Sequence, residues 1–333
     1  MRGRVLFQIL SLSGGGFLGL YTAIVLAELE EVSGQPLADR FDLIAGTSVG
    51  GILGIAVAAR VPMSKVVAAF EEHGHEIFSD RPVPQGRFRQ KLELRRNALG
   101  AKYRPAKLRE VIVDLVGEHS KMQDLSQRLI VPAVNLTKGS PQLFKTPHHE
   151  TILRDGRLAL LDVALATSAA PTFFPVHAIS GELFADGGLF ANSPDQQALH
   201  EAEHFLGQDA ATVKMVSVGT TTSQFSISNA TSPNMGWIDW MSDQRLPKVM
   251  IAAQQIIADA VMKHRLGGNY LRIDRQQSAE QERFLALDVA NRAAVLDLRA
   301  LAEASIRENI NSPLLKSAMA HNAPQQKFGG TNG

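Results

Sequence analysis

A sharp turn between an apolar strand and an apolar helix is the feature that most limits how this chain can fold. Residues 41–45 form a short apolar run typical of a buried strand, and residues 52–59 have the pattern of a buried helix. Between them lies Gly46-Thr47-Ser48-Val49-Gly50, a G-x-S-x-G pattern whose small residues allow a tight turn that exposes the serine. Strand, turn and helix follow in the order of a nucleophile elbow, so Ser48 is the candidate nucleophile. The alternative is a small-residue loop between two core elements.

A second glycine-rich segment consists of Gly14, Gly15 and Gly16. It follows a predicted strand over 5–12 and opens a predicted helix, so its backbone amides can point outward with no side chain in the way. A serine that attacks a carbonyl group needs hydrogen-bond donors for the negative charge that develops on oxygen. The three glycines are therefore candidates for an oxyanion hole.

The same segment permits a different interpretation, because residues 14–19 also spell G-x-G-x-x-G, the fingerprint of dinucleotide-binding folds. Those folds need an acidic residue at the end of the second strand, where it binds a ribose hydroxyl. Here the second strand ends in Ala45-Gly46-Thr47-Ser48, without an acid. The sequence therefore disfavours NAD binding.

The serine also needs a base, and Asp186 is the candidate. It follows the apolar run 183–185 and precedes two glycines, which predicts a carboxylate at a strand end with an unobstructed turn beside it. Burial would raise its pKa from the usual value near ~4, and its carboxylate could then accept a hydrogen bond from Ser48 directly. An Asx turn is the structural alternative for this aspartate. A Ser-Asp-His triad is the chemical alternative, since His200 or His204 follows in the order that such hydrolases use.

Strand-like and helical patterns alternate along the chain. The predicted strands are 5–12, 41–45, 129–136, 142–146, 183–185, 213–218 and 270–273. The predicted helices are 20–32, 52–59, 106–116, 160–168, 194–205, 247–264 and 292–308. This alternation predicts an α/β fold, with a mostly parallel central sheet between helices on both faces. We expect residues 1–310 to form one domain and the polar, glycine-rich residues 311–333 to form a flexible tail.

Composition narrows the choice of partners and chemistry. A net charge of +1 over 333 residues gives no reason to expect binding of a nucleic acid polymer. The chain has no cysteine, which excludes disulfides and thiolate metal sites and fits a cytoplasmic location. The ten histidines form no cluster with the spacing of metal ligands, and no stretch approaches the ~20 apolar residues of a membrane span. We therefore expect neither a metal nor a transmembrane segment.

Three motifs together resemble the signatures of the patatin-like phospholipases: Ser13 to Gly19, Gly46 to Gly50, and Asp186-Gly187-Gly188. The resemblance runs from about Val5 to about Thr220. It implies a patatin-type three-layer α/β/α fold and hydrolysis of fatty acyl esters without a metal or cofactor. It also implies that Ser48 and Asp186 act as a dyad in place of a triad.

Within that family, residues 12–17, 20–23 and 186–192 resemble the CapV-type phospholipases of bacterial antiphage systems, which cyclic dinucleotides activate. This resemblance implies a cytoplasmic enzyme that stays inactive until a messenger such as cyclic GMP-AMP binds, and that then degrades phospholipid at the inner membrane surface. Peripheral membrane contact follows from it, and the question whether the chain forms a homo-oligomer stays open. The alternative within the family is an unregulated esterase or lysophospholipase.

One position departs from the family pattern, because Leu18 stands where those enzymes usually have arginine. A leucine cannot bind phosphate or brace the glycine loop through hydrogen bonds. The oxyanion donors themselves belong to the backbone, so the departure puts headgroup contact or the bracing of the loop in doubt.

Two further segments suit either a membrane or an ordinary structural role. Ten Lys or Arg residues lie between Arg81 and Arg109 against one acid, Glu93, and would attract an anionic membrane surface or the phosphates of a dinucleotide. They would equally suit a solvated loop and helix face. Trp237 and Trp240 could dock at a lipid interface, although burial under the following helix is the commoner arrangement.

Overall fold

The computed structural model describes residues 6–79, 100–221, 227, 233–241, 245–278 and 280–328. Its centre is an eight-stranded sheet with the order β5-β6-β3-β2-β1-β7-β8, in which β4 also pairs with β3. The strands are β1 (Phe7–Leu12), β2 (Leu43–Gly46), β3 (Arg128–Asn135), β4 (Ser140–Lys145), β5 (His177–Ile179), β6 (Glu182–Asp186), β7 (Val213–Val218) and β8 (Tyr270–Ile273).

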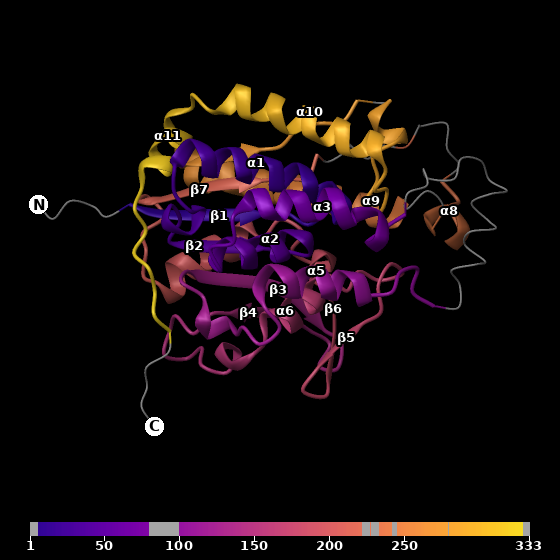
Figure 1. The fold of residues 1–333 in the computed structure, drawn as a ribbon, viewed down its shortest axis with the longest axis horizontal. Coiled ribbons are helices and arrows are strands. Elements are labelled where there is room, and N and C mark those ends of the chain that lie inside the picture. Colours follow the sequence, from indigo (N-terminus) through magenta and orange to yellow (C-terminus); the bar gives the residue numbers. More distant parts are fainter. Residues whose placement is uncertain are drawn as a thin grey trace, which may run out of the picture.

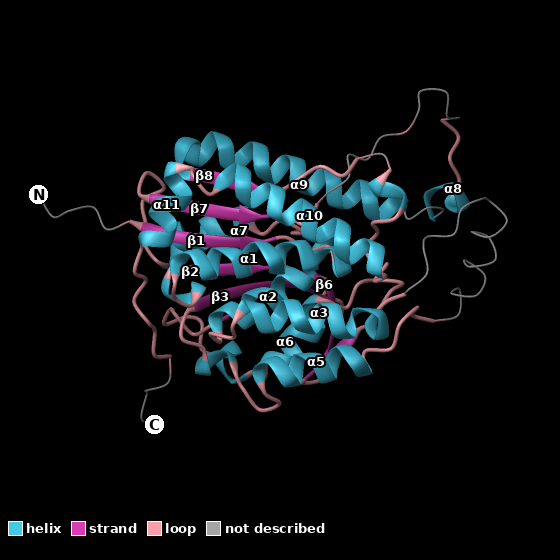
Figure 2. Cartoon of the chain, turned by 45° about the horizontal axis from the view of Figure 1, so that its top comes forward, coloured by secondary structure: helices cyan, strands magenta, loops and turns pink. Residues whose placement is uncertain are grey.

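The inner strands of the sheet run in one direction. Strands β3, β2, β1, β7 and β8 pair in parallel, whereas β4 and β6 pair antiparallel to β3 and β5 pairs antiparallel to β6. The predicted α/β fold with a mostly parallel sheet is therefore confirmed. In such sheets the carboxyl ends of the strands meet at one edge and carry the ligand sites. In Figure 2 the arrowheads of β1 and β7 point toward this edge.

Helices cover both faces of the sheet, as Figures 1 and 2 show. They are α1 (Gly19–Ser33), α2 (Val49–Ala58), α3 (Met63–Ile77), α5 (Ala106–Val116), α6 (Leu160–Thr167), α7 (Asp195–His200), α8 (Trp237–Met241), α9 (Arg245–Leu266), α10 (Arg292–Asn309) and α11 (Pro313–Ala320). Side chains alternate between the two faces along each strand. Leu10 and Leu12 pack in the core that α1, α2 and α3 share, whereas Ile9 packs with α7 and α9 on the other side.

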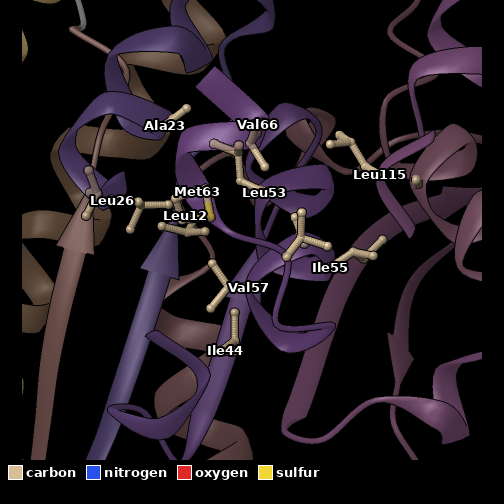
Figure 3. Packing of buried hydrophobic residues seen from close by; sticks show 14 of the residues in the cluster. Leu12, Ala23, Leu26, Ile44, Leu53, Ile55, Val57, Met63, Val66 and Leu115 are labelled. Atoms are coloured by element: carbon tan, nitrogen blue, oxygen red, sulfur yellow. The ribbon is translucent and has the colours of Figure 1, made fainter. Parts of the chain in front are cut away.

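The larger core forms where α1 and α2 lie over the sheet. Figure 3 shows Leu12 of β1 beside Leu26 of α1, and Ile44 of β2 beside Val57 of α2. These side chains are buried, and each contributes roughly 1.5–3 kcal/mol relative to an exposed position. Helix α2 is apolar on every side and packs against α1, α3, α5 and α6, and its first residue, Val49, is buried directly after Ser48.

The prediction of a flexible tail from residue 311 is wrong for residues 313–320, which form α11. Ser312 caps α11 by accepting a hydrogen bond from the amide of Leu315, and Pro313 occupies the first turn of the helix. Leu315 and Met319 are buried in the core, and α11 lies beside α1 (Figure 1). Beyond the helix, Gln326 still donates its amide to the carbonyl of Ser126. The final segment therefore belongs to the packed structure up to the last residues described.

Candidate active site

The turn between β2 and α2 has the backbone geometry of a nucleophile elbow. Ser48 has φ 56° and ψ −126°, a conformation that is unfavourable for a residue with a side chain. A Cβ atom on Gly46 would lie 2.1 Å from the carbonyl oxygen of Gly50, so only glycine fits there. The G-x-S-x-G spacing is therefore a steric requirement of this turn.

Two threonines hold the turn in its strained conformation. The amide of Ser48 donates to Oγ1 of Thr167 at 2.9 Å, and the Thr167 hydroxyl donates to the carbonyl of Pro132 at 2.6 Å. On the other side, the hydroxyl of Thr47 donates to the carbonyl of Ala191 at 2.6 Å. These contacts connect the elbow to β3 and to the segment that follows Asp186. No pattern in the sequence points to Thr167.

Ser48 and Asp186 meet directly, as the residue patterns predict. The serine Oγ donates to Oδ2 of Asp186 at 2.6 Å, and the amide of Gly188 donates to Oδ1 at 2.6 Å. Burial raises the pKa of Asp186 from 3.8 to about 6, although both hydrogen bonds act to lower it. At neutral pH the carboxylate is thus ionised but more basic than an exposed aspartate, which suits a group that accepts a serine proton.

The glycine loop differs from the prediction at one of its three residues. The amide of Gly14 donates to the carbonyl of Asn192 at 2.9 Å, so it is already engaged. Gly15 and Gly16 line the cavity beside Ser48, and among the described residues no acceptor takes their amide hydrogens. Gly16 has φ 55°, and a Cβ atom there would lie 2.1 Å from the carbonyl oxygen of Leu287.

A further donor at this position was not predicted from the sequence. Val49 is the first residue of α2, and the first amides of a helix have no acceptor within it. Val49 lines the same cavity, next to the serine. The signal for this donor is the position of Val49 directly after the nucleophile. In a nucleophile elbow the backbone amide of that residue commonly serves as an oxyanion donor.

Leu18 and Arg272 explain how the glycine loop is braced without the family arginine. The side chain of Leu18 is buried in the apolar core and offers the loop no hydrogen bond, so the contact from this residue to the loop is the bond from its backbone amide to the carbonyl of Gly15 at 3.1 Å. From β8, Nη1 of Arg272 donates to Oγ of Ser13 at 3.0 Å, directly before the loop, and to Oγ of Ser217 at 2.8 Å. A largely buried cation from a distant strand therefore fixes the start of the loop.

An apolar cavity of about 250 Å³ opens beside Ser48 and Asp186. Its wall comes from several helices and consists almost entirely of hydrocarbon side chains. It includes Ile52 from α2, Phe70 and Ile77 from α3, Val111 and Leu115 from α5, and Met250 and Ile251 from α9. Such a wall can take up the hydrocarbon part of a substrate while the reacting group stays at the polar end near Ser48.

The histidine alternative is not supported by the geometry. All ten histidines lie in the described part of the chain, and none of them lines the cavity. The rings of His200 and His204 stack on each other on the outer surface, with centroids 5.2 Å apart. In the same described part, no three His, Asp or Glu side chains gather in the manner of a metal site.

Of the two further segments, the basic one lies partly outside the described residues, whereas the structure describes the tryptophan segment. Of the basic residues, those from Arg81 to Arg96 lie outside them, whereas Lys102 forms an ion pair with Asp288 at 2.7 Å. Burial under the following helix, which we expected to be the commoner arrangement for the tryptophans, is wrong for Trp237. This residue lies on α8 with 69% of its surface exposed. No helix in the described ranges is long and apolar enough to cross a bilayer.

Comparison with known proteins assigns the chain to a family. The family model described as patatin-like phospholipase matches residues 10–199. A cGAMP-activated phospholipase of Pseudomonas aeruginosa is 39% identical over 331 residues, which cover 98% of this chain and 96% of that protein. A protein of the same name from Vibrio cholerae is 36% identical, and the match covers 87% of this chain and 88% of that protein. Another from Escherichia coli is 32% identical, and the match covers 88% of this chain and 86% of that protein. The chain therefore belongs to the patatin-like phospholipase family.

Proposed function

We propose that this protein is a lipid acyl hydrolase in which Ser48 is the nucleophile and Asp186 the general base. The observation that carries the proposal is the 2.6 Å hydrogen bond from the serine hydroxyl to the buried carboxylate. A base in direct contact with the nucleophile needs no intervening imidazole. The amides of Gly15, Gly16 and Val49 are the donors for the oxyanion, and Gly14 shapes the loop through its bond to Asn192.

The reaction proceeds in two steps. Ser48 Oγ bonds to the ester carbonyl carbon while Asp186 accepts the hydroxyl proton, and the negative charge on the carbonyl oxygen is stabilised by the loop amides. The tetrahedral intermediate expels the alcohol, which takes the proton from Asp186 and leaves an acyl-serine. Water then attacks the acyl group, Asp186 accepts its proton, and that proton returns to Ser48 as the fatty acid leaves.

The apolar cavity supports a fatty acyl ester as the substrate. Apart from the reacting groups and nearby backbone, its wall offers hydrocarbon and aromatic surface that a polar substrate could not satisfy. A phospholipid can insert one acyl chain there while its headgroup stays outside. No metal or cofactor has a part in this mechanism, since a serine and a carboxylate suffice for it.

We infer activation by a cyclic dinucleotide from the relatives, since three cGAMP-activated phospholipases match this chain over most of its length. Cyclic GMP-AMP is the first messenger to test, with degradation of phospholipid at the cytoplasmic face of the inner membrane as the outcome in antiphage defence. An unregulated esterase or lysophospholipase is the alternative, and it would be active without any messenger.

Peripheral membrane contact is supported by the outer face of α9. Ala253, Ile256 and Ile257 are exposed on this helix at spacings of three and four residues, which bring them to one side of it, and Leu246 is exposed at the mouth of the cavity. Trp237 is exposed on the adjoining α8. Because the inner face of α9 lines the cavity, this apolar surface continues from the mouth of the site, where a bilayer would deliver the lipid. A second copy of the chain is the other occupant that such a face could bind.

The test is hydrolysis of a fluorogenic ester and of phospholipid vesicles by wild type and by Ser48→Ala, each with a panel of cyclic dinucleotides. We expect at least about 1,000-fold lower turnover for Ser48→Ala. Activity only with cyclic GMP-AMP would support the regulated enzyme, and activity without a messenger the unregulated one. Alanine at His200 and at His204 should leave turnover unchanged, because a loss comparable to that of Ser48→Ala would require a triad.

A further inference from the structure

We propose that Gln254 is a positioning residue for this reaction, and that it ties helix α9 to both halves of the active site. The inference rests on the proposed function. Gln254 projects from α9 toward the segment that follows Asp186. Its side-chain Nε2 donates to the carbonyl of Gly188 at 2.9 Å, and its Oε1 accepts from the amide of Asn192 at 2.8 Å.

The two contacts fix the orientation of the Gln254 amide. A backbone carbonyl can only accept a hydrogen bond and a backbone amide can only donate one. The Nε2 atom must therefore face Gly188 and the Oε1 atom must face Asn192, because a flipped amide would lose both bonds. One side chain thus sets the distance between two points of the loop that carries the catalytic carboxylate.

The first contact acts on Asp186. The carbonyl of Gly188 is held by Gln254, while the amide of the same residue donates to Asp186 Oδ1 at 2.6 Å. The other carboxylate oxygen, Oδ2, accepts from Ser48. A shift of Gly188 would lengthen the bond to Oδ1, leave the carboxylate with one donor and change its orientation toward the serine.

The second contact acts on the glycine loop. The backbone amide of Asn192 donates to Gln254, and the backbone carbonyl of Asn192 accepts from the amide of Gly14 at 2.9 Å. Its side-chain Nδ2 also donates to the carbonyl of Gly14 at 3.2 Å. Gly14 directly precedes Gly15 and Gly16, two of the three residues that we propose as oxyanion donors. Gln254 therefore lies two hydrogen bonds away from the base on one side and from the loop on the other.

The position of Gln254 on α9 gives this link a functional consequence. Pro247, Met250 and Ile251 line the cavity on the same face of the helix as Gln254, whereas Ile256 is exposed on the opposite face and Ile257 on the flank between the two. Any partner that displaces α9 from its outer side would move Gln254 with it. The geometry points to α9 as an element whose position sets the alignment of Ser48, Asp186 and the glycine loop.

The test uses Gln254→Met, which keeps the length of the side chain and removes both hydrogen bonds. In hydrolysis of a fluorogenic ester with cyclic GMP-AMP present, we expect kcat to fall about 10- to 100-fold with KM nearly unchanged. The acidic limb of the pH profile should move to higher pH, because a looser Gly188 amide stabilises the ionised carboxylate less. Hydrogen exchange should become faster in peptides that cover residues 186–192, a readout that does not depend on activity.

The matched control is Met262→Ala, a buried position on α9 that packs against the opposite part of the sheet. It should lower thermal stability without moving the pH profile or the exchange of residues 186–192. The same exchange and pH profile in Gln254→Met as in wild type would overturn the inference, even with Ser48→Ala inactive. If wild type shows no ester hydrolysis, the proposed function fails. Hydrogen exchange then still tests the role of Gln254, because faster exchange in Gln254→Met confined to residues 186–192 shows that this side chain holds the loop.

Discussion

The hydroxyl of Ser48 lies 2.6 Å from Oδ2 of Asp186, although 138 positions separate the two residues in the chain. They meet because β2 and β6 lie on either side of β3 and end close together along it: Ala45 near the end of β2 pairs with Ile130, and Asp186 at the end of β6 pairs with Ala133. The parallel sheet supplies Ser48 at the end of one strand, and an antiparallel strand supplies Asp186 from the other side. The consequences of this contact can be measured.

Activity should depend on the ionisation of Asp186. The base must be ionised to accept the serine proton, and burial raises its pKa to about 6. We therefore expect kcat/KM to be constant above about pH 7 and to fall about tenfold per pH unit well below pH 6. Initial rates with a soluble ester, with circular dichroism at each pH as the folding control, provide the measurement. A rate that stays constant down to pH 4.5 would contradict the assignment.

Stability should show the opposite trend. The pKa of Asp186 is raised in the folded protein, so its favourable contribution is complete below pH 3.8 and is lost as the pH rises through about 6. The difference between 3.8 and about 6 corresponds to about 3 kcal/mol. Asp186→Asn removes this cost, so the inactive variant should unfold at higher urea concentration than wild type at pH 8. The two proteins should converge near pH 4, and a less stable variant at pH 8 would contradict the expectation.

Thr167→Val should weaken the elbow without touching the reacting groups. The substitution keeps the shape but leaves the amide of Ser48 without its acceptor and the carbonyl of Pro132 without its donor. We expect a loss of about 2 kcal/mol in the free energy of unfolding and a kcat at least about tenfold lower. Thr151→Val is the matched control, because Thr151 is exposed and its hydroxyl is hydrogen-bonded to His149, which is not part of the site. Equal kinetics for the two variants would argue against a role of Thr167.

Arg272→Leu should destabilise the whole protein, since it removes the cation from a buried network. Burial alone would lower the pKa of this guanidinium, but the carboxylates of Asp274 and Asp195 raise it above its ordinary value, so it is always charged. The variant leaves Asp195 buried without the cation, at a cost of about 3–5 kcal/mol. Urea denaturation measures it, with the exposed Arg307→Leu as the control that should change stability little. A loss below about 1 kcal/mol would contradict the bracing role.

The sequence predicted what depends on local chemistry. The elbow at Ser48 follows from the small residues that its turn requires, and most strands were located within two residues because each is a short apolar run. Helix α3 was missed because charged residues, histidines and a glycine hide its apolar face. Helix α11 was missed although Ser312 and Pro313 are ordinary signals of a helix start.

The features that escaped prediction depend on contacts between distant segments. The engaged amide of Gly14 could not be foreseen, because its partner Asn192 lies 178 positions further along the chain. The same holds for Thr167 and Gln254, whose side chains act on backbone groups of other elements. Motifs therefore identified the two residues that we propose as nucleophile and base, whereas only the fold could identify those that hold them.

The exposed face of α9 should govern binding to lipid vesicles. Ile256 and Ile257 have 67% and 57% of their surface exposed, so serine at both positions should leave folding and hydrolysis of a soluble ester unchanged. We expect sedimentation with vesicles and hydrolysis of vesicle phospholipid to fall at least about tenfold, because interfacial binding scales with buried apolar area. Leu153 and Leu296, exposed to 64% and 58%, are the matched control pair on other elements. If the α9 variant instead alters the oligomeric state in light scattering and binds vesicles normally, the face is an interface between copies of the chain.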